Sequence, residues 1–184
     1  MNDSQRGWFF IIVIVLAAAF WTWLSRVPDS TLSGSRLANP REDFPAPDFT
    51  LDHLDGGSTQ LSDLRGNVVI VNLWASWCAP CRAEMPAFQK LYNANRERGL
   101  EVLAVNSTFQ DSETDARNFA GQLGLTYPIL LDREGVVSRQ YRLQALPSTF
   151  IIDRSGIIRT VIIGGPASEA TLQTQIEALL NESP

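Results

Sequence analysis

Hydrophobic and polar positions along most of the chain follow either the two-residue period of strands or the 3.6-residue period of helices. The run VVIVNLW, residues 68–74, is continuous and mostly β-branched, which is typical of a strand buried on both faces of a parallel sheet. Further strands are predicted at LEVLAVN, at YPILLD and on both sides of the turn at residues 153–156. Residues 44–66 are expected to form one short strand, a turn at Gly56-Gly57 and a short helical turn.

The stretches between these strands have the pattern of helices. A helix is expected from near Cys78 to about Arg98, ended by Gly99. A second helix begins at the capping pattern of Ser112 and ends at Gly124. A short helical piece at VVSRQYRL and an amphipathic helix at SEATLQTQIEALL follow. Strand–helix–strand units followed by a hairpin and a helix predict an α/β fold with a central mixed sheet flanked by helices.

An uncharged segment at residues 8–24 has neither pattern. As a helix it reaches about 25 Å, the short end of what crosses the apolar core of a bilayer. Tryptophans lie near both of its ends, where a membrane has its interfaces. Residues 1–24 are therefore predicted to be a membrane anchor with a transmembrane helix at about 8–24. A cleaved signal peptide, favoured by the small residues 17–19, and a buried soluble helix are the alternatives.

Residues 25–43 are rich in Ser, Pro, Arg and Asp and lack apolar periodicity, so they are predicted to be a flexible linker. The orientation of the anchor does not follow from its flanking charges. Arg6 precedes the span, and Arg26, Arg36 and Arg41 follow it, so the positive-inside rule does not by itself place the rest of the chain outside the cytoplasm.

Composition fits this division. A chain of 184 residues with 45% hydrophobic residues can form one globular domain, expected at residues 44–184, with an appendage. The net charge of −5 and the absence of Lys and Arg clusters argue against a nucleic-acid partner or a surface for anionic membranes.

Both cysteines of the chain, Cys78 and Cys81, lie where a buried strand is followed by a helix N-terminus. The unpaired N–H groups and the positive helix dipole there stabilise a thiolate at Cys78, which lowers its pKa and makes it the attacking sulfur. Cys81 follows nearly one turn later, within reach of a disulfide with Cys78. Pro80 falls in the first turn, where its missing N–H costs nothing. This pattern favours redox catalysis.

Other functions for the cysteine pair need residues that the sequence lacks. A zinc or iron–sulfur site would have to recruit carboxylates, because His53 is the only histidine. Copper binding by Cys78, Cys81 and His53 is a second alternative. A purely structural disulfide is a third, and it would stabilise the fold little because the loop that it closes is small. No metal and no cofactor are therefore expected.

The motifs WASWCAPC and LPSTFIID, together with Pro86, resemble the thioredoxin superfamily, and more closely its membrane-anchored TlpA/ResA-type thiol-disulfide reductases. The likeness extends from Phe44 to about Leu180 and implies a thioredoxin-like fold. FPAPDFTL and the residues before the cysteines are also similar to peroxiredoxins. Peroxiredoxins, however, place their reactive cysteine in a different motif, so a peroxidase is the weaker alternative.

The resemblance also implies roles for residues outside the cysteine pair. Leu146-Pro147 matches a cis-proline that faces the cysteines and presents backbone groups to an extended substrate. Glu84 matches a partly buried glutamate that relays the proton of Cys81, although it could also be a solvated helix residue. Asn72 stands where ordinary thioredoxins have a buried aspartate, which makes a role for Glu84 more attractive.

Trp77, Pro80, Leu146 and Pro147 are the candidate substrate-contacting residues. For Trp74 and Trp77, packing in the core is the safer interpretation, and shielding of the sulfurs is the alternative. The expected function is a reductase of oxidised protein dithiols on the extracytoplasmic side of the cytoplasmic membrane, supplied by a transmembrane thiol donor. The resemblance suggests apocytochrome c as substrate. A disulfide oxidase or isomerase, and a metallochaperone or binding module, are the alternatives.

Overall fold

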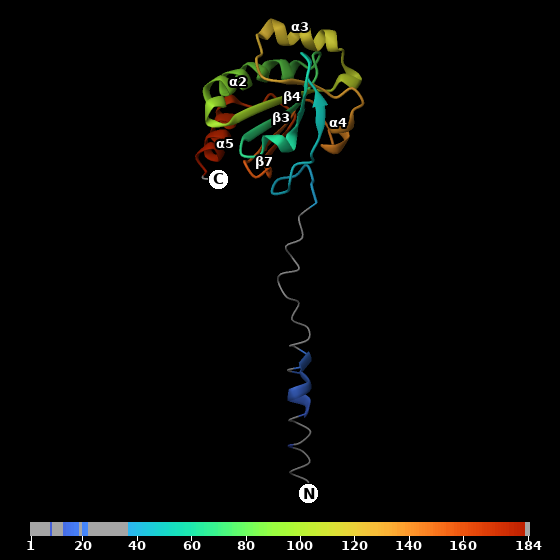
Figure 1. Cartoon of the computed structure of the whole chain (residues 1–184), viewed down its shortest axis with the longest axis vertical. Coiled ribbons are helices and arrows are strands. Elements are labelled where there is room, and N and C mark those ends of the chain that lie inside the picture. Colours follow the sequence, from blue (N-terminus) through green and yellow to red (C-terminus); the bar gives the residue numbers. More distant parts are fainter. Residues whose placement is uncertain (1–7, 9–12, 19, 22–36, 183–184) are drawn as a thin grey trace. The chain divides into compact units, whose positions relative to one another are not determined.

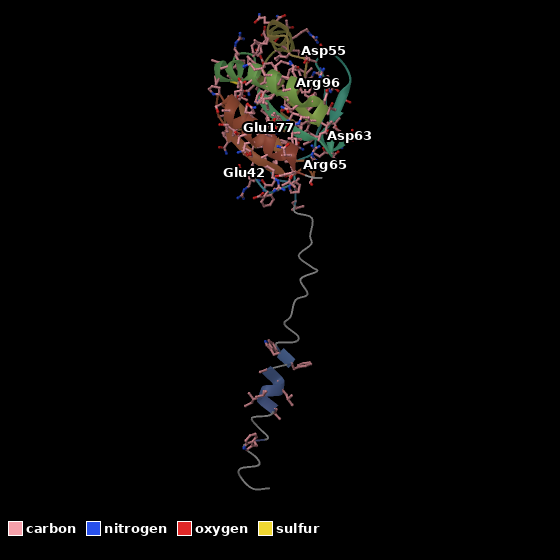
Figure 2. The ribbon with its side chains drawn as sticks, turned by 90° about the vertical axis from the view of Figure 1, so that its left-hand side faces the viewer. Glu42, Asp55, Asp63, Arg65, Arg96 and Glu177 are labelled. Atoms are coloured by element: carbon pink, nitrogen blue, oxygen red, sulfur yellow. A yellow bond between two sulfur atoms is a disulfide. The ribbon has the colours of Figure 1, made fainter. Side chains whose placement is uncertain are left out.

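The computed structural model describes residue 8, residues 13–18, residues 20–21 and residues 37–182. The chain divides into two compact units, residues 1–35 and residues 36–184. The second unit contains the sheets and the helices from α2 onward (Figure 1). Most of its charged side chains lie on the outside, as Glu42, Asp55, Asp63, Arg65 and Arg96 do (Figure 2).

A five-stranded mixed sheet with the strand order β5-β4-β3-β6-β7 forms the centre of this unit. The strands are β3 (Val68–Trp74), β4 (Leu100–Asn106), β5 (Ile129–Leu131), β6 (Ser148–Ile152) and β7 (Ile158–Ile163). β4 pairs in parallel with both β3 and β5, whereas β6 runs antiparallel to both β3 and β7. The central strand β3 is buried at every position, which confirms the prediction from its continuous, mostly β-branched sequence.

Four helices pack around the sheet: α2 (Ala79–Asn95), α3 (Glu113–Leu123), α4 (Val136–Gln140) and α5 (Glu169–Asn181). Alternate residues of β3 point to opposite faces, as the pleat requires. Val68, Ile70 and Trp74 join the core cluster that contains apolar residues of α2, α3 and α5. Val69, Val71 and Leu73 join a second cluster with residues of α4 and of the segment before β2. The fold is the predicted α/β arrangement, with a core on each face of the sheet.

The helix boundaries confirm the capping signals in the sequence. Ser112 accepts a hydrogen bond at its Oγ from the backbone N–H of Asp115, 3.2 Å away, and Gly124 ends α3 with a φ of 61°. After α2 the chain continues as a short 3-10 helix, η3 (Arg96–Arg98), before Gly99 ends it with a φ of 90°. Two further 3-10 helices are η2 (Leu61–Leu64) and η4 (Thr108–Gln110).

A separate two-stranded hairpin precedes the main sheet. It pairs β1 (Thr50–Asp52) with β2 (Ser58–Gln60) in antiparallel register. The sequence predicted only one strand here, because the three residues of β2 include no hydrophobic side chain that would mark a half-buried strand.

The segment just before Phe44 is bonded to β7, although its composition assigned it to the linker. The Glu42 carboxylate accepts a hydrogen bond from the Val161 backbone N–H at 3.1 Å. The Asp43 carboxylate accepts from Arg159 at 3.0 Å, and the Asp43 backbone N–H donates to the Ile158 carbonyl at 2.8 Å. These contacts extend the ordered domain toward the N-terminus.

In the first unit, residues 13–18 and 20–21 are helical. The remainder of the expected span, residues 9–12, 19 and 22–24, and the linker up to residue 36 lie outside the described residues. Among the residues that the structure describes, no helix has both the length and the apolar character needed to cross a membrane.

Candidate active site

Cys78 and Cys81 are joined by a disulfide at the junction of β3 and α2, with their Cα atoms 5.3 Å apart. Cys78 is the N-cap of α2 in extended conformation, and its Sγ accepts a hydrogen bond from the Cys81 backbone N–H at 3.3 Å. Pro80 lies in the first turn, as predicted. The N–H groups at this helix end stabilise negative charge on Cys78 Sγ once the disulfide is reduced.

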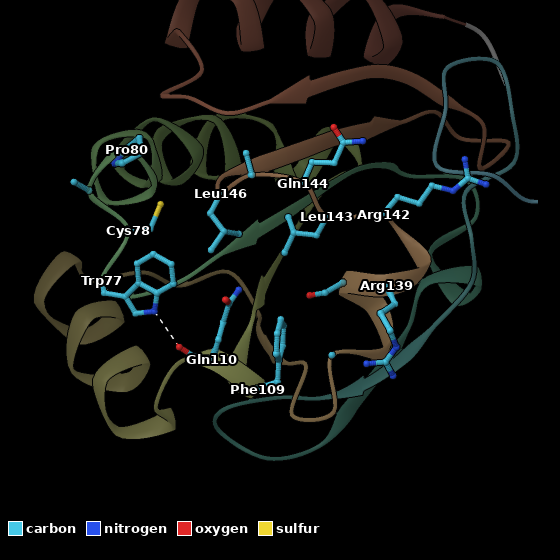
Figure 3. A pocket seen from close by; sticks show the side chains of 14 residues that line it. Trp77, Cys78, Pro80, Phe109, Gln110, Arg139, Arg142, Leu143, Gln144 and Leu146 are labelled. Carbon is cyan, nitrogen blue, oxygen red and sulfur yellow. Dashed lines mark hydrogen bonds between the residues drawn. The ribbon is translucent and has the colours of Figure 1, made fainter.

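The two sulfurs differ in what they can reach. Cys78 is 4% exposed and lines a cavity of about 610 Å³, whereas Cys81 is fully buried and is not among the lining residues. Figure 3 shows Cys78 at one end of this cavity, which we call the Cys78 groove. An incoming sulfur can therefore approach Cys78 without passing Cys81.

Three segments that lie far apart in the sequence form the Cys78 groove. They are the loop at Trp77–Pro80, the Phe109–Gln110 end of η4, and the stretch from Gly135 to Leu146 that contains α4 (Figure 3). Of the four candidate substrate-contacting residues, Trp77, Pro80 and Leu146 line the groove.

The two tryptophans have different environments. Trp74 is fully buried and its ring centroid lies 5.5 Å from that of Phe119, which confirms core packing for Trp74. Core packing is wrong for Trp77, which is 60% exposed. Its indole Nε1 donates to the Gln110 carbonyl at 3.1 Å, which holds the ring at the wall of the Cys78 groove (Figure 3).

Glu84 is buried, with only 1% of its surface exposed. Its two carboxylate oxygens accept hydrogen bonds from Asn72 Nδ2 at 2.8 Å and from the Ala167 backbone N–H at 2.9 Å. Asn72 Nδ2 also donates to Thr149 Oγ1 at 2.9 Å. The alternative of a solvated helix glutamate is therefore wrong. Glu84 lies one turn after Cys81, on the same face of α2.

Burial raises the pKa of the Glu84 carboxyl, and its hydrogen bonds from Ala167 and Asn72 offset only part of that effect. Tyr127 lies close enough that Glu84 adds to the rise that burial causes in the tyrosine pKa. A carboxyl with a raised pKa exchanges its proton closer to neutral pH than a solvated glutamate does, which suits it to proton transfer.

The Leu146-Pro147 peptide bond is cis, as the family resemblance implied. The Pro147 carbonyl accepts a hydrogen bond from the Gly164 N–H at 2.8 Å. A Cβ on Gly165 would lie 2.7 Å from Pro147 Cγ and 3.1 Å from Glu84 Oε2. Residues 164–167 therefore connect the proline beside the Cys78 groove with the buried carboxylate.

His53 is not among the residues around Cys78. Its Nε2 is 2.7 Å from Thr59 Oγ1, and it lines a separate cavity with Tyr92 and Arg117. Among the residues that the structure describes, no group of three or more His, Cys, Asp and Glu side chains is placed to hold a metal ion.

Several residues at the site were not found from the sequence. Thr149, which accepts from Asn72, and Ala167, which donates to Glu84, are far from their partners along the chain and belong to no local pattern. Phe109, Arg139 and Arg142 line the Cys78 groove only because η4 and α4 fold against it.

Comparisons with known proteins agree with this geometry. Residues 43–161 match the AhpC/TSA family. The chain is 41% identical over 124 residues to the thiol-disulfide oxidoreductase ResA of Geobacillus kaustophilus, covering 67% of this chain and 70% of the relative. It is 33% identical over 172 residues to ResA of Oceanobacillus iheyensis, covering 94% and 85%.

A solved structure shows the same fold. A crystal structure described as a thiol:disulfide interchange protein DsbE of Chlorobium tepidum superposes with a TM-score of 0.70 at 34% identity, covering 77% of this chain and 99% of that one. The thioredoxin-like fold, the Cys78–Cys81 pair and the identity to ResA lead to one conclusion. The chain belongs to the AhpC/TSA family and, within it, is a thiol-disulfide oxidoreductase of the ResA/TlpA type.

Proposed function

We propose that this chain reduces disulfides of other proteins on the extracytoplasmic side of the cytoplasmic membrane, where residues 1–24 anchor it. The observation that carries the proposal is the unequal access to the two sulfurs. Cys78 lines the groove and Cys81 is closed off beneath it. This arrangement suits an enzyme that forms one mixed disulfide at a time.

The reaction exchanges one disulfide for another. The Cys78 thiolate attacks a sulfur of the substrate disulfide, a bond forms between the two sulfurs, and the second substrate sulfur leaves as a thiolate that takes up a proton. Cys81 then loses its proton and attacks Cys78 Sγ, which releases the first substrate sulfur. The substrate gains two electrons and two protons, and the chain is left with the Cys78–Cys81 disulfide.

Glu84 accepts the proton of Cys81 in the second step. Its position one turn after Cys81 and its raised pKa support this role. Trp77, Pro80 and Leu146 contact the substrate along the groove, and the backbone that flanks the cis bond before Pro147 pairs with an extended chain.

Reduction, rather than oxidation or isomerisation, is favoured by the residues between the cysteines. Ala79 and Pro80 add no positive charge that would stabilise the reduced form and so make the pair a strong oxidant. Continued turnover requires electrons from a membrane thiol donor. The substrate class that the family resemblance suggests is the thiols of apocytochrome c.

Trapping of the mixed disulfide tests the proposal. In Cys81→Ser the resolving sulfur is missing, so covalent complexes with substrates and with the electron donor are expected to accumulate and to disappear on reduction. Mass spectrometry of these complexes identifies both partners. Cys78→Ser is the matched control and is expected to trap few or none. The reverse pattern, or no trapping with an active wild type, would overturn the assignment of the two sulfurs.

A further inference from the structure

The Cys78 groove has a charge opposite in sign to that of the whole chain. The chain carries a net charge of −5, yet the lining of the groove contains Arg139 and Arg142 and no aspartate or glutamate. Figure 3 shows the two guanidinium groups at the end of the groove away from Cys78. Figure 3 shows the apolar side chains of Trp77 and Leu146 near Cys78, whereas Phe109 lies further along the groove, beside Gly135 and Arg139.

The two arginines have no carboxylate partner. Within the described part of the chain neither forms an ion pair, and the only hydrogen bond of the Arg139 side chain goes to the backbone carbonyl of Glu134, at 2.8 Å. Asp111, which follows the lining residue Gln110, is engaged by donors of Ser76, Asn106 and Ser112. The positive charge of the groove is therefore open to a ligand.

The backbone at Arg142 gives an independent reason to assign its side chain a function. Arg142 follows the end of α4 with a φ of 49°, in the left-handed region where glycine or asparagine is usual. The Leu143 N–H donates to the Ser138 carbonyl at 2.8 Å, the bond that closes a helix end around such a position. Glycine would adopt this conformation without the steric cost that arginine has.

We propose that the Cys78 groove binds an extended substrate segment that carries an apolar side chain beside the attacked cysteine and an acidic side chain further along. Arg139 and Arg142 recognise the acidic group, while Trp77 and Leu146 contact the apolar one. This specificity rests on the proposed reduction of protein disulfides. Because both arginines are exposed, replacing either one is expected to slow the reduction of an acidic substrate by about two- to fivefold. Salt weakens this effect.

Three synthetic peptides test the proposal on the full-length chain in neutral detergent. Each contains one intramolecular Cys-x-x-Cys disulfide, followed by glutamates, glutamines or lysines at successive positions. The pre-reduced protein is expected to reduce the glutamate peptide fastest and the lysine peptide slowest at low salt. The ratio of the two second-order rate constants for single-turnover reduction should fall toward one in Arg139→Gln/Arg142→Gly and at high salt.

Two control variants separate a loss of charge recognition from a general effect of removing an arginine or of altering stability. Arg96→Gln removes one exposed arginine just beyond the far end of α2 and should leave the ratio unchanged (Figure 2). Arg142→Gly alone should keep or raise the melting temperature while the ratio falls. Equal rates for the glutamate and lysine peptides in the wild type would overturn this specificity without contradicting the proposed reductase function. If the protein reduces none of the three peptides, the result would instead contradict the proposed function.

Discussion

Glu84 has an environment that suits a group which gains and loses a proton. An ionised carboxylate can accept about four hydrogen bonds, and the structure provides Glu84 with two, from Asn72 and Ala167. The lack of further donors and of a cationic partner among these contacts leaves burial as the main influence on its pKa, which is raised. Because the folded protein holds this proton to a higher pH than the unfolded chain does, the contribution of Glu84 to the unfolding free energy falls as the pH rises above about 4.5.

Glu84→Gln is expected to slow disulfide reduction by up to about 100-fold, the lower end of the range for general acid–base catalysis. The variant should still fold, because the amide oxygen keeps one of the two hydrogen bonds and the buried charge is removed. The falling contribution of Glu84 above pH 4.5 should be absent, so the unfolding free energy of the variant relative to the wild type should increase as the pH rises. Alkylation of the cysteines across pH and denaturant unfolding at several pH values measure both effects.

Glu97→Gln is the matched control, because it replaces an exposed glutamate in η3. It should change neither the cysteine titration nor the reduction rate. If the cysteines of Glu84→Gln titrate as in the wild type, Glu84 has no part in proton transfer.

At the scale of elements, the loop at residues 164–167 determines how Pro147 and Glu84 sit beside the sheet. Gly165→Ala adds a Cβ that meets Pro147 Cγ at 2.7 Å, so the loop or the proline has to move. We expect destabilisation by about 1–3 kcal/mol, as for overpacked sites, together with slower disulfide exchange. Thermal unfolding and exchange rates measure the two effects.

Gly121→Ala is the control for adding the same methyl group. Gly121 lies in α3, is exposed, and has nothing within 4 Å of the added Cβ. Alanine there should stabilise the helix by about 0.5–1 kcal/mol and leave exchange unchanged. Equal behaviour of the two variants would mean that the loop does not position Pro147 and Glu84.

Elements with strong local signals could be predicted from the sequence, and contacts between distant segments could not. The apolar run of β3, the Ser112 cap and the left-handed Gly124 are local features, and each appears where it was expected. The burial of Glu84 agrees with its helical spacing from the buried residues Cys81 and Phe88. The partners of Glu84 and the exposure of Trp77, in the loop before α2, depend on segments from elsewhere in the chain. The local feature that marks Arg142 is its positive φ, and this is known only from the structure.

For the whole molecule, we predict that the domain lies outside the cytoplasm. The proposed anchor and the resemblance to membrane-anchored TlpA/ResA-type reductases support this location, whereas the arginines around residues 8–24 do not decide it. Protease added to intact spheroplasts should degrade residues 44–184, because they are accessible from outside. Protection of this region in intact spheroplasts, with degradation after lysis, would place it in the cytoplasm.

The reduction potential of the Cys78–Cys81 pair tests most directly whether the protein is a reductase. Ala79 and Pro80 carry no charge, and an ionised Glu84 would oppose the thiolate that stabilises the reduced form of strong oxidants. Equilibration of the full-length chain with glutathione redox buffers gives the potential. We predict a value nearer the roughly −270 mV of thioredoxin than the roughly −120 mV of a strong oxidant. A value above about −180 mV would contradict reduction and identify the protein as an oxidase or isomerase.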